Sequence, residues 1–330
     1  MKTELRKFNT SKVSWIVALA SALVNLIHLC WGQLLPLWNG FKENYHVLIP
    51  YSTRHFLWVM RHEYWSFAPL LVIFSAFVLE KLMPAKPRTR IISISVIQDF
   101  FWFVVDVAAH STVIFTFGIL IKWFYDHYLS FFTLHIADQW PQSQRILFAF
   151  LLFDFTQWAN HYLRHKVRPF WFFHAVHHSQ TEMNLFTSER IHPLEYVIRK
   201  PTTFIPLYIF QVHPFGIVSL TFFIHWYTRF YHANIRSNFG FLKHFMVTPQ
   251  FHRIHHSREA QHQDKNLGAF LTIWDRMFGT LHTNYEEYPE TGIHDSRFPM
   301  EKQGGLFIIT NYAKQFIYPM KQLAKEVFQR

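Results

Sequence analysis

Three short clusters of histidine recur in the middle of the chain. They read His161-Tyr-Leu-Arg-His165, His174-Ala-Val-His177-His178 and His252-Arg-Ile-His255-His256. Because residues three and four apart lie on one face of a helix, each cluster can present two or three imidazoles side by side. Eight imidazoles are too many for one metal ion with ordinary coordination, and they suit two ions. Imidazole favours iron, zinc, copper or nickel over magnesium and calcium.

A lone histidine is more often a core or surface residue than a ligand, but three clusters within residues 161–256 favour a metal centre. The single cysteine, Cys30, excludes an intramolecular disulfide, a cysteine-based zinc site and an iron–sulfur cluster. Any metal must therefore be held by His, Asp or Glu. Metal-bound imidazoles usually donate their second N–H to a carboxylate or a carbonyl. The candidate carboxylates are Asp154, Glu195, Asp264 and Asp275.

The composition indicates a helical membrane protein. Half of the residues are hydrophobic and 19% are aromatic, with 38 Phe and 12 Trp, whereas Gly is scarce at 10. The formal charge of +11 fits cytoplasmic loops that follow the positive-inside rule, or attraction to anionic lipid headgroups. The basic residues are scattered between long apolar runs, so nucleic acid is not an expected partner.

Five apolar runs are candidates for membrane helices, which need about 20 mostly apolar residues. They cover residues 13–35, 67–83, 91–121, 146–158 and 201–228. Basic residues precede the first run and follow the second, which predicts a hairpin with both ends in the cytoplasm. The third run then crosses outward and the fourth returns. The first histidine cluster is therefore expected on the cytoplasmic side.

The last run must bring the chain back to that side, because the three clusters share one centre. His213-Pro214-Phe215-Gly216 interrupts this run, since proline disrupts a helix and glycine permits a turn. The run therefore predicts a helical hairpin that enters the membrane and returns. The expected fold is an all-α integral membrane bundle with about four spanning helices, this re-entrant hairpin and a cytoplasmic helical cap rich in histidine.

Further residues extend the histidine pattern over roughly 145–285. They are Asp154 and Trp158 before the first cluster, Ser179 after the second, Arg190-Ile-His192-Pro193-Leu194-Glu195, His232-Ala-Asn234, Thr248-Pro249 before the third, Asp264-Lys265-Asn266-Leu267-Gly268 and Trp274-Asp275-Arg276-Met277-Phe278-Gly279-Thr280. With the three histidine boxes, these elements resemble the fatty acid hydroxylase/sterol desaturase superfamily of integral-membrane di-iron enzymes. Leu267 departs from that pattern, which commonly has tyrosine there, and we expect the change to affect pocket shape more than metal binding.

The resemblance implies two iron ions that react with O2, and a lipid product that is hydroxylated or desaturated. Fatty acyl, sterol, ether-lipid and carotenoid substrates are all compatible with it. It also implies three regions: residues 1–145 as a transmembrane region, 146–284 as the catalytic region and 285–330 as a cytoplasmic tail.

The expected metal ligands are the box histidines and a ninth, in the His-x-Asn element. The set is His161, His165, His174, His177, His178, His232, His252, His255 and His256, with His225 as a further candidate on the same helical face as His232. The residues expected behind the ligands are Asp154, His192, Glu195, Asn234, Asp264 and Asp275. Asp154 lies seven residues before His161 and is expected to orient His161 or His165. His262 and His282 are expected to be solvated loop residues.

Electrons are expected from a separate protein. The segment His213-Pro214-Phe215-Gly216 lacks the second glycine of the haem-binding His-Pro-Gly-Gly element of cytochrome b5 domains, and no soluble domain surrounds it. A ferredoxin or a cytochrome b5-type protein is the expected donor, docking on the basic cytoplasmic surface. The expected location is the bacterial inner membrane, with the ER membrane as the second option and the metal centre on the cytoplasmic side.

Two other classes of protein stay open. A zinc-dependent membrane enzyme could use a histidine-rich centre to activate water, although few coordination positions would be free and no Glu lies beside the boxes as a base. A non-enzymatic membrane metal-binding or transport protein would place its ligands along a path in the bilayer. The boxes instead lie at helix ends on one side, which favours the di-iron interpretation.

Overall fold

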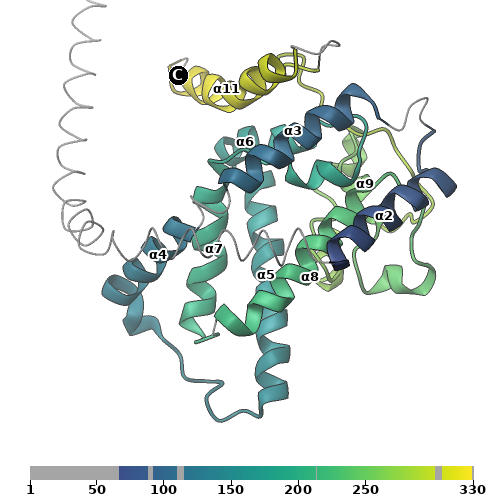
Figure 1. Cartoon of the computed structure of the whole chain (residues 1–330). Helices are drawn as coiled ribbons and strands as arrows, with labels where there is room; N and C mark the ends of the chain where they lie inside the picture. Colours follow the sequence, from purple (N-terminus) through teal and green to yellow (C-terminus); the bar gives the residue numbers. More distant parts are fainter. Residues whose placement is uncertain (1–66, 88–91, 110–114, 213, 302–306, 329–330) are drawn as a thin grey trace, which may run out of the picture. The chain divides into compact units, whose positions relative to one another are not determined.

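The computed structural model describes residues 67–87, 92–109, 115–212, 214–301 and 307–328 (Figure 1). The chain divides into two compact units, Met1–His55 and Phe56–Arg330, and all the described residues belong to the second. The predicted helix at 13–35 lies outside the described residues. Within them every regular element is a helix, apart from isolated β-bridges, so the all-α prediction is confirmed.

Among the described residues, three α-helices precede the helix that carries the first histidine box. They are α2 (Phe67–Leu82), α3 (Ile94–Ala109) and α4 (Phe115–Phe124). The second predicted run corresponds to α2, whereas the third run, 91–121, contains both α3 and α4, with residues 110–114 outside the described part. A π-helical turn, Tyr125–Leu129, and a 3-10 turn, Ser130–Phe132, follow α4.

No helix in the described segments combines the length and the apolar character that a membrane crossing requires. The longest of them, α5 (Gln142–Lys166), has 25 residues and ends in the basic residues Arg164, His165 and Lys166. The bundle of about four spanning helices, and its orientation, stay predictions.

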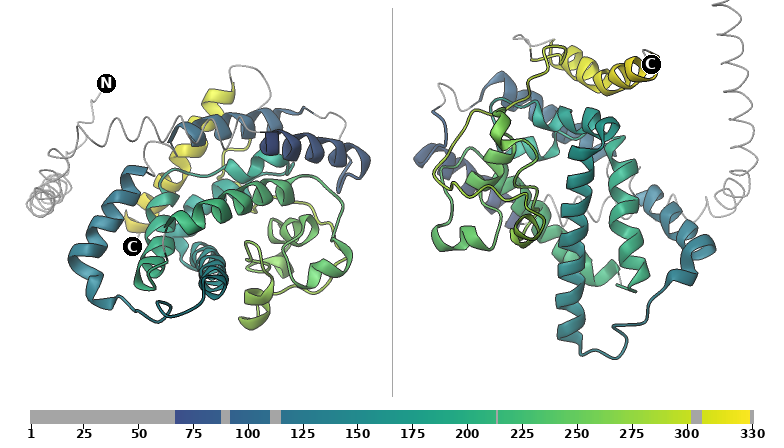
Figure 2. Two further views of the ribbon diagram at one scale, coloured as in Figure 1. Left: turned by 60° about the horizontal axis from the view of Figure 1, so that its bottom comes forward. Right: turned by 180° about the vertical axis from the view of Figure 1, so that it is seen from behind.

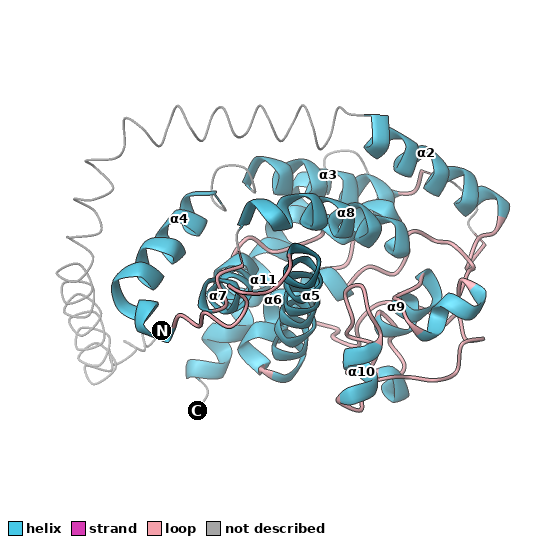
Figure 3. Cartoon of the chain, turned by 90° about the horizontal axis from the view of Figure 1, so that it is seen from below, coloured by secondary structure: helices cyan, strands magenta, loops and turns pink. Residues whose placement is uncertain are grey.

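α5 lies among the next three helices and packs against all of them. They are α6 (Arg168–His178), α7 (Glu195–Ile209) and α8 (Pro214–His232). Figure 3 looks along α5 and shows α6, α7 and α8 around it. Phe153 of α5, Leu207 of α7 and Ile224 of α8 are buried in one apolar cluster. This packing holds the half of α5 that precedes the first box against α7 and α8.

The run at 201–228 is divided into two helices, α7 and α8, but proline does not end the first of them. α7 ends in a Schellman cap, in which Val212 N–H donates to Leu207 O at 2.9 Å and Gln211 N–H donates to Tyr208 O at 3.1 Å. Gln211 adopts the left-handed conformation (φ 52°) that glycine usually supplies at this position. The chain reversal therefore comes from backbone capping.

Pro214 instead begins α8, a position at which a backbone N–H would have no hydrogen-bond partner within the helix. The predicted role of Gly216 in the turn is wrong, because this glycine lies inside α8. α7 begins at Glu195, whose carboxylate lies beside His174, and α8 ends at His232, beside His177. The chain thus leaves the histidine boxes along α7 and returns to them along α8, as a hairpin would.

Short helices and one long helix complete the described chain. The short helices are η5 (Leu185–Glu189), η6 (Gly240–His244), α9 (Pro249–His255), η7 (Ala260–His262) and α10 (Ile273–Met277). The long helix, α11 (Phe307–Phe328), packs against α3 and α6 (Figures 1 and 2). Trp102, Val176 and Tyr318 are buried between these three helices. The predicted tail therefore ends in a helix that covers the helix of the second box.

Candidate metal centre

The structure brings the box histidines and His232 together in two groups. Within each group the ring nitrogens that could bind an ion lie within 4.8 Å of one another. The first group consists of His161, His165, His174, His178 and His255. The second group consists of His177, His232, His252 and His256. His225 belongs to neither, and its Nε2 lies 4.0 Å from Glu189 Oε1.

Four helix ends deliver these rings. α5 and α6 contribute their last turns, α8 contributes its last residue, and α9 carries the third box with His256 as its C-cap. α9 is only 7 residues long, and its start is stabilised by a cap: Thr248 Oγ1 accepts a hydrogen bond from Phe251 N–H at 3.1 Å, and Pro249 is the first helical residue. The cap lets so short a helix place its histidines.

The second and third boxes each serve both groups. In α6, His174 and His178 are four residues apart and belong to the first group, whereas His177 belongs to the second. In α9 the pattern is reversed, because the pair four residues apart belongs to the second group and His255 to the first. The two groups are adjacent, with the rings of His178 and His256 stacked at 4.4 Å between centroids.

The inward ring nitrogens have the spacing of ligands to a common ion. Two nitrogens about 2.1 Å from a metal, at right angles to each other, are about 3.0 Å apart. The shortest Nε2–Nε2 distances are 2.8 to 3.2 Å, and they join His161–His174, His174–His178, His177–His232, His232–His252 and His252–His256. The Nε2 atoms of His165 and His255 are buried without a hydrogen-bond partner among the described residues. A cation would satisfy these converging lone pairs.

Burial keeps the rings neutral. Desolvation lowers the pKa of every histidine in both groups below its usual value, and neighbouring imidazoles lower the pKa of most of them further. Desolvation takes the pKa of His232 to about 4. Metals bind the neutral imidazole. The fold therefore keeps the imidazoles in the neutral state that metal coordination requires.

Outer carbonyls decide which ring nitrogen faces the centre. His161 Nδ1–H donates to Leu267 O at 2.9 Å, and His255 Nδ1–H donates to Lys265 O at 3.0 Å. A carbonyl can only accept, so Nδ1 carries the proton and Nε2 keeps its lone pair. A carbonyl one turn earlier in α8 holds Nδ1 of His232 in the same way at 2.6 Å.

Two predicted carboxylates lie directly behind ligands. Asp264 Oδ1 is 3.3 Å from His165 Nδ1, and Glu195 Oε2 is 3.4 Å from His174 Nδ1. The hydrogen bond with His165, assisted by Lys166, lowers the pKa of Asp264 to about 2, so this side chain is an ionised acceptor at neutral pH. Glu195 is a buried partner of Arg164.

Asp154 does not orient either histidine of the first box, and that expectation is wrong. Its carboxylate accepts hydrogen bonds from Phe270 N–H at 3.0 Å, Leu271 N–H at 3.1 Å and Trp274 Nε1–H at 2.9 Å. Seven residues do place it on the face of the first box, but two turns of helix carry it away from the metal centre. Asp154 instead fixes the loop before α10 to α5.

Asp275 acts through the backbone of that loop. Its carboxylate accepts from Leu267 N–H at 2.8 Å and from Gly268 N–H at 2.7 Å, and Leu267 O in turn holds His161. A Cβ at position 268 would lie 2.9 Å from Asp275 Oδ2 and 2.8 Å from Leu271 O, so the loop needs glycine there. Residue 267 contacts the metal centre through its main-chain carbonyl, so a change from tyrosine to leucine at this position leaves that contact in place.

His192 and Asn234 lie away from both groups, so the expectation that they stand behind ligands is wrong. His192 Nε2–H donates to Phe316 O in α11 at 2.9 Å. Asn234 donates to Lys86 O at 2.8 Å and accepts from Arg253 at 3.2 Å. Both residues connect distant segments to the metal-binding region.

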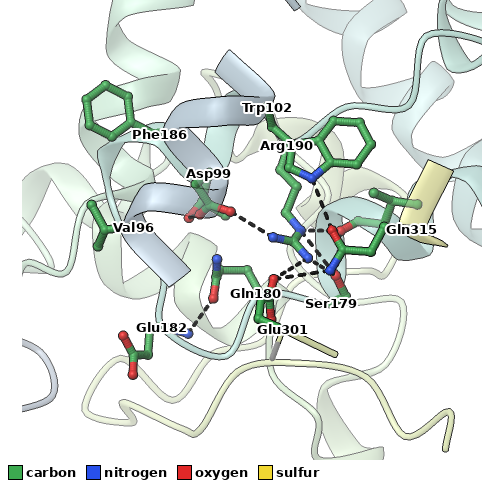
Figure 4. Close-up of polar contacts among 12 residues, drawn as sticks. Val96, Asp99, Trp102, Ser179, Gln180, Glu182, Phe186, Arg190, Glu301 and Gln315 are labelled. Atoms are coloured by element: carbon green, nitrogen blue, oxygen red, sulfur yellow. Dashed lines mark hydrogen bonds and ion pairs between the residues drawn. The ribbon is translucent and has the colours of Figure 1, made fainter. Parts of the chain in front are cut away.

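Arg190 is the centre of a buried polar cluster that sequence reasoning only partly found (Figure 4). Its guanidinium lies 2.9 Å from Asp99 Oδ1 and 2.6 Å from Glu301 Oε1, and its Nε–H donates to Val176 O at 2.9 Å. Arg190 thereby joins α3, the second box and the segment before α11. Glu301 carries no local sequence signal, because only the folded chain brings it to Arg190.

Part of the chain is similar to a known protein family. Residues 146–280 match the model of a family described as fatty acid hydroxylase. This region of the chain is similar to the fatty acid hydroxylase family. The matched segment begins in α5 and ends just after α10, so it contains both histidine groups.

Three relatives illustrate the range of the fatty acid hydroxylase relationship. An ornithine lipid hydroxylase of Rhizobium tropici is 28% identical over 216 residues, which cover 61% of this chain and 64% of the relative. The alkylglycerol monooxygenase of Homo sapiens is 33% identical over 145 residues, 42% of this chain and 31% of the relative. A Delta(7)-sterol 5(6)-desaturase of Gibberella zeae is 30% identical over 134 residues, 40% of this chain and 36% of the relative. The chain thus spans less than two thirds of each of them, and no solved structure matches it.

Replacing one box histidine should remove the metal ion from its own group only. We expect His161→Ala, loaded with iron and purified, to hold about one metal ion per chain where the wild type holds two, because the second group keeps all its histidines. Elemental analysis measures this content. The control is His135→Ala, whose side chain is 65% exposed and outside both groups. Unchanged metal content in His161→Ala would contradict the grouping.

The metal-free protein should lose stability as the pH falls. The pKa of His232 in the folded chain, about 4, lies below its usual value of 6.5, so the unfolded chain takes up the proton first. Stability present above pH 6.5 is therefore lost as the pH falls towards 4, by about 3 kcal/mol for this ring. Urea unfolding of metal-free protein at several pH values measures the slope. An equal slope in His232→Gln would refute this origin.

The Arg190 cluster should stabilise the fold. Glu301→Gln keeps the shape of the side chain but removes its charge, and we expect the free energy of unfolding to fall by about 1.5–3 kcal/mol, the worth of a hydrogen bond to a charged group. Chemical denaturation measures the loss. The matched control is Glu286→Gln, at an exposed position. Equal stability of the two variants would show that Glu301 contributes nothing through Arg190.

Proposed function

We propose that this chain is a membrane-bound, O2-dependent oxidoreductase that hydroxylates or desaturates a lipid at a centre of two iron ions. The observation that carries the proposal is the pair of adjacent groups of buried, neutral histidines within a fatty acid hydroxylase region. The number of groups supports two ions, and the family supports chemistry on a lipid. Activity, substrate and partners all belong to this proposal.

The ligand chemistry supports iron. Among the described residues no carboxylate belongs to either group of histidines, and an all-imidazole set leaves the ions cationic, unlike the carboxylate-rich soluble di-iron sites. Bound iron would supply the activation of O2 and the removal of hydrogen from an unactivated C–H bond. Zinc fits imidazole equally well but has no redox chemistry. It is therefore the less favoured metal.

The residues of the chain prepare this centre in three ways. Burial keeps the rings unprotonated, and the outer carbonyls Leu267 O and Lys265 O turn Nε2 of His161 and of His255 inward. The rings are also shielded from water: His174 is 1% exposed and His256 is fully buried. A centre with little water protects a strong oxidant from side reactions.

Exposed apolar side chains support a lipid substrate and a membrane location. On α2, Leu70, Phe74 and Leu82 are 55%, 68% and 74% exposed, and on α3 Phe100 and Val104 are 47% and 49% exposed. Apolar side chains exposed in such numbers mark contact with a membrane or a partner. The proposed location is the bacterial inner membrane, with the ER membrane second and the histidine groups on the cytoplasmic side.

A separate acidic protein of the ferredoxin or cytochrome b5 type is proposed as the electron donor. The chain carries a net charge of +11. Lys166 and Arg168, which follow the first box directly, have side chains that are 43% and 70% exposed. Complementary charge guides such encounters and fixes their orientation.

Lipid profiling of cells with and without the gene tests the activity. We expect a lipid that gains one oxygen atom or loses two hydrogen atoms when the wild type is expressed, and no such product from His255→Ala at equal membrane content. The exposed-residue variant His294→Ala is the control and should form the product. Full product formation by His255→Ala, or stoichiometric zinc without iron after iron-replete expression, would overturn the proposal.

A further inference from the structure

A third cluster of metal-binding side chains lies outside the two histidine groups. It consists of His262, His282 and Glu287, whose ligand atoms lie within 4.8 Å of one another. The expectation that both histidines are solvated loop residues is wrong: the side chain of His262 is fully buried and that of His282 is 19% exposed. His282 and Glu287, from the segment after α10, lie against His262.

The distances within this cluster fit a single small ion. Glu287 Oε2 lies 2.7 Å from His262 Nε2, and Glu287 Oε1 lies 3.5 Å from His282 Nε2. Tetrahedral ligands at about 2.1 Å from zinc are about 3.4 Å apart. Small movements of the side chains would therefore bring all three ligand atoms to one ion. The two rings are nearly perpendicular, with their centroids 4.7 Å apart.

The nitrogen atoms are poised as ligands. His262 Nδ1 lies 2.9 Å from Ser257 Oγ, which can accept its proton and leave the lone pair of Nε2 free. His282 Nε2 is buried and has no hydrogen-bond partner among the described residues. A simple His262–Glu287 hydrogen bond would account for one contact but would leave His282 Nε2 unsatisfied, which is rare for a buried polar atom.

The chemistry of the set selects the ion. Two imidazoles and one carboxylate form the ligand set of several zinc enzymes, in which water takes the fourth position. Magnesium and calcium prefer oxygen ligands. The side chain of Glu287 is 28% exposed, so the cluster lies close to solvent, which could supply the fourth ligand.

We propose that His262, His282 and Glu287 bind one zinc ion, separate from the ions of the two histidine groups. The site joins η7 to the segment that follows α10. Between these ligands in the sequence lie Asp264, which contacts His165, and Lys265, whose carbonyl holds His255. The zinc ion thus stabilises the loop that supplies outer partners to the first group. Its role is structural, and it does not depend on which reaction the protein catalyses.

Metal counting on the full-length protein tests this site. The protein is loaded with iron, exposed to a slight excess of zinc and desalted, and its iron and zinc are measured. We expect the wild type to hold one more zinc ion per chain than Glu287→Gln or His282→Ala, with equal iron in all three. Loss of an outer partner of a metal ligand lowers affinity about 10–100-fold. Loss of a ligand itself should therefore weaken zinc binding at least 100-fold in a competition titration.

The controls separate this site from the histidine groups and from misfolding. Glu286→Gln and His294→Ala change exposed residues of the same types and should keep the additional zinc. Glu287→Gln preserves the shape of the side chain, so its metal-free form should stay folded, with the far-UV circular dichroism of the metal-free wild type. Cobalt in place of zinc should give tetrahedral d–d absorption in the wild type that Glu287→Gln lacks. Equal zinc content and affinity in the wild type, Glu287→Gln and His282→Ala would overturn the proposal, whatever the iron content and activity.

Discussion

The structure depends on one constraint: nine imidazoles must be buried, neutral and turned so that their lone pairs converge. Each condition has a free-energy cost without a metal, since buried lone pairs repel one another and lack water. For several of the rings the fold meets this cost with acceptors placed on their outer side. Backbone carbonyls from the loop between α9 and α10 hold two rings of the first group, and carboxylates from that loop and from α7 approach two more. Elements far apart in the sequence thus together determine which ring nitrogen faces the metal centre.

Buried charged residues fix those outer elements in place. Asp154 and Asp275 bind the main chain of the closing loop, and Arg190 connects the second box to α3 and to the segment before α11. Buried ion pairs of this kind contribute less to net stability than to a unique arrangement, because desolvation offsets much of their attraction. Their position one layer behind the histidines therefore suits a centre in which the position of each ring matters.

Helical periodicity alone predicts much of the centre. Spacings of three and four residues place box histidines on common faces, and the chain break near Pro214 follows from local backbone chemistry. What the sequence does not reveal depends on contacts between distant segments. Asp154 lies on the same face of α5 as the first box, but two turns too far along the helix to contact its histidines. Glu301 reaches Arg190 only through the packing of α11 on α3 and α6. The solvated character expected of His262 fails for the same reason, since His282 and Glu287 from a later segment lie against it. The division of each HxxHH box between two groups is likewise invisible until the helices are placed.

That division has a mechanical consequence. α6 and α9 are short helices, and each carries histidines of both groups. Neighbouring residues of a helix differ in direction by about 100°, so the rings of the two groups lie on different faces of each helix. A twist of either helix that moves its rings in one group therefore also turns its rings in the other. The two groups are mechanically coupled through α6 and α9, although no histidine belongs to both.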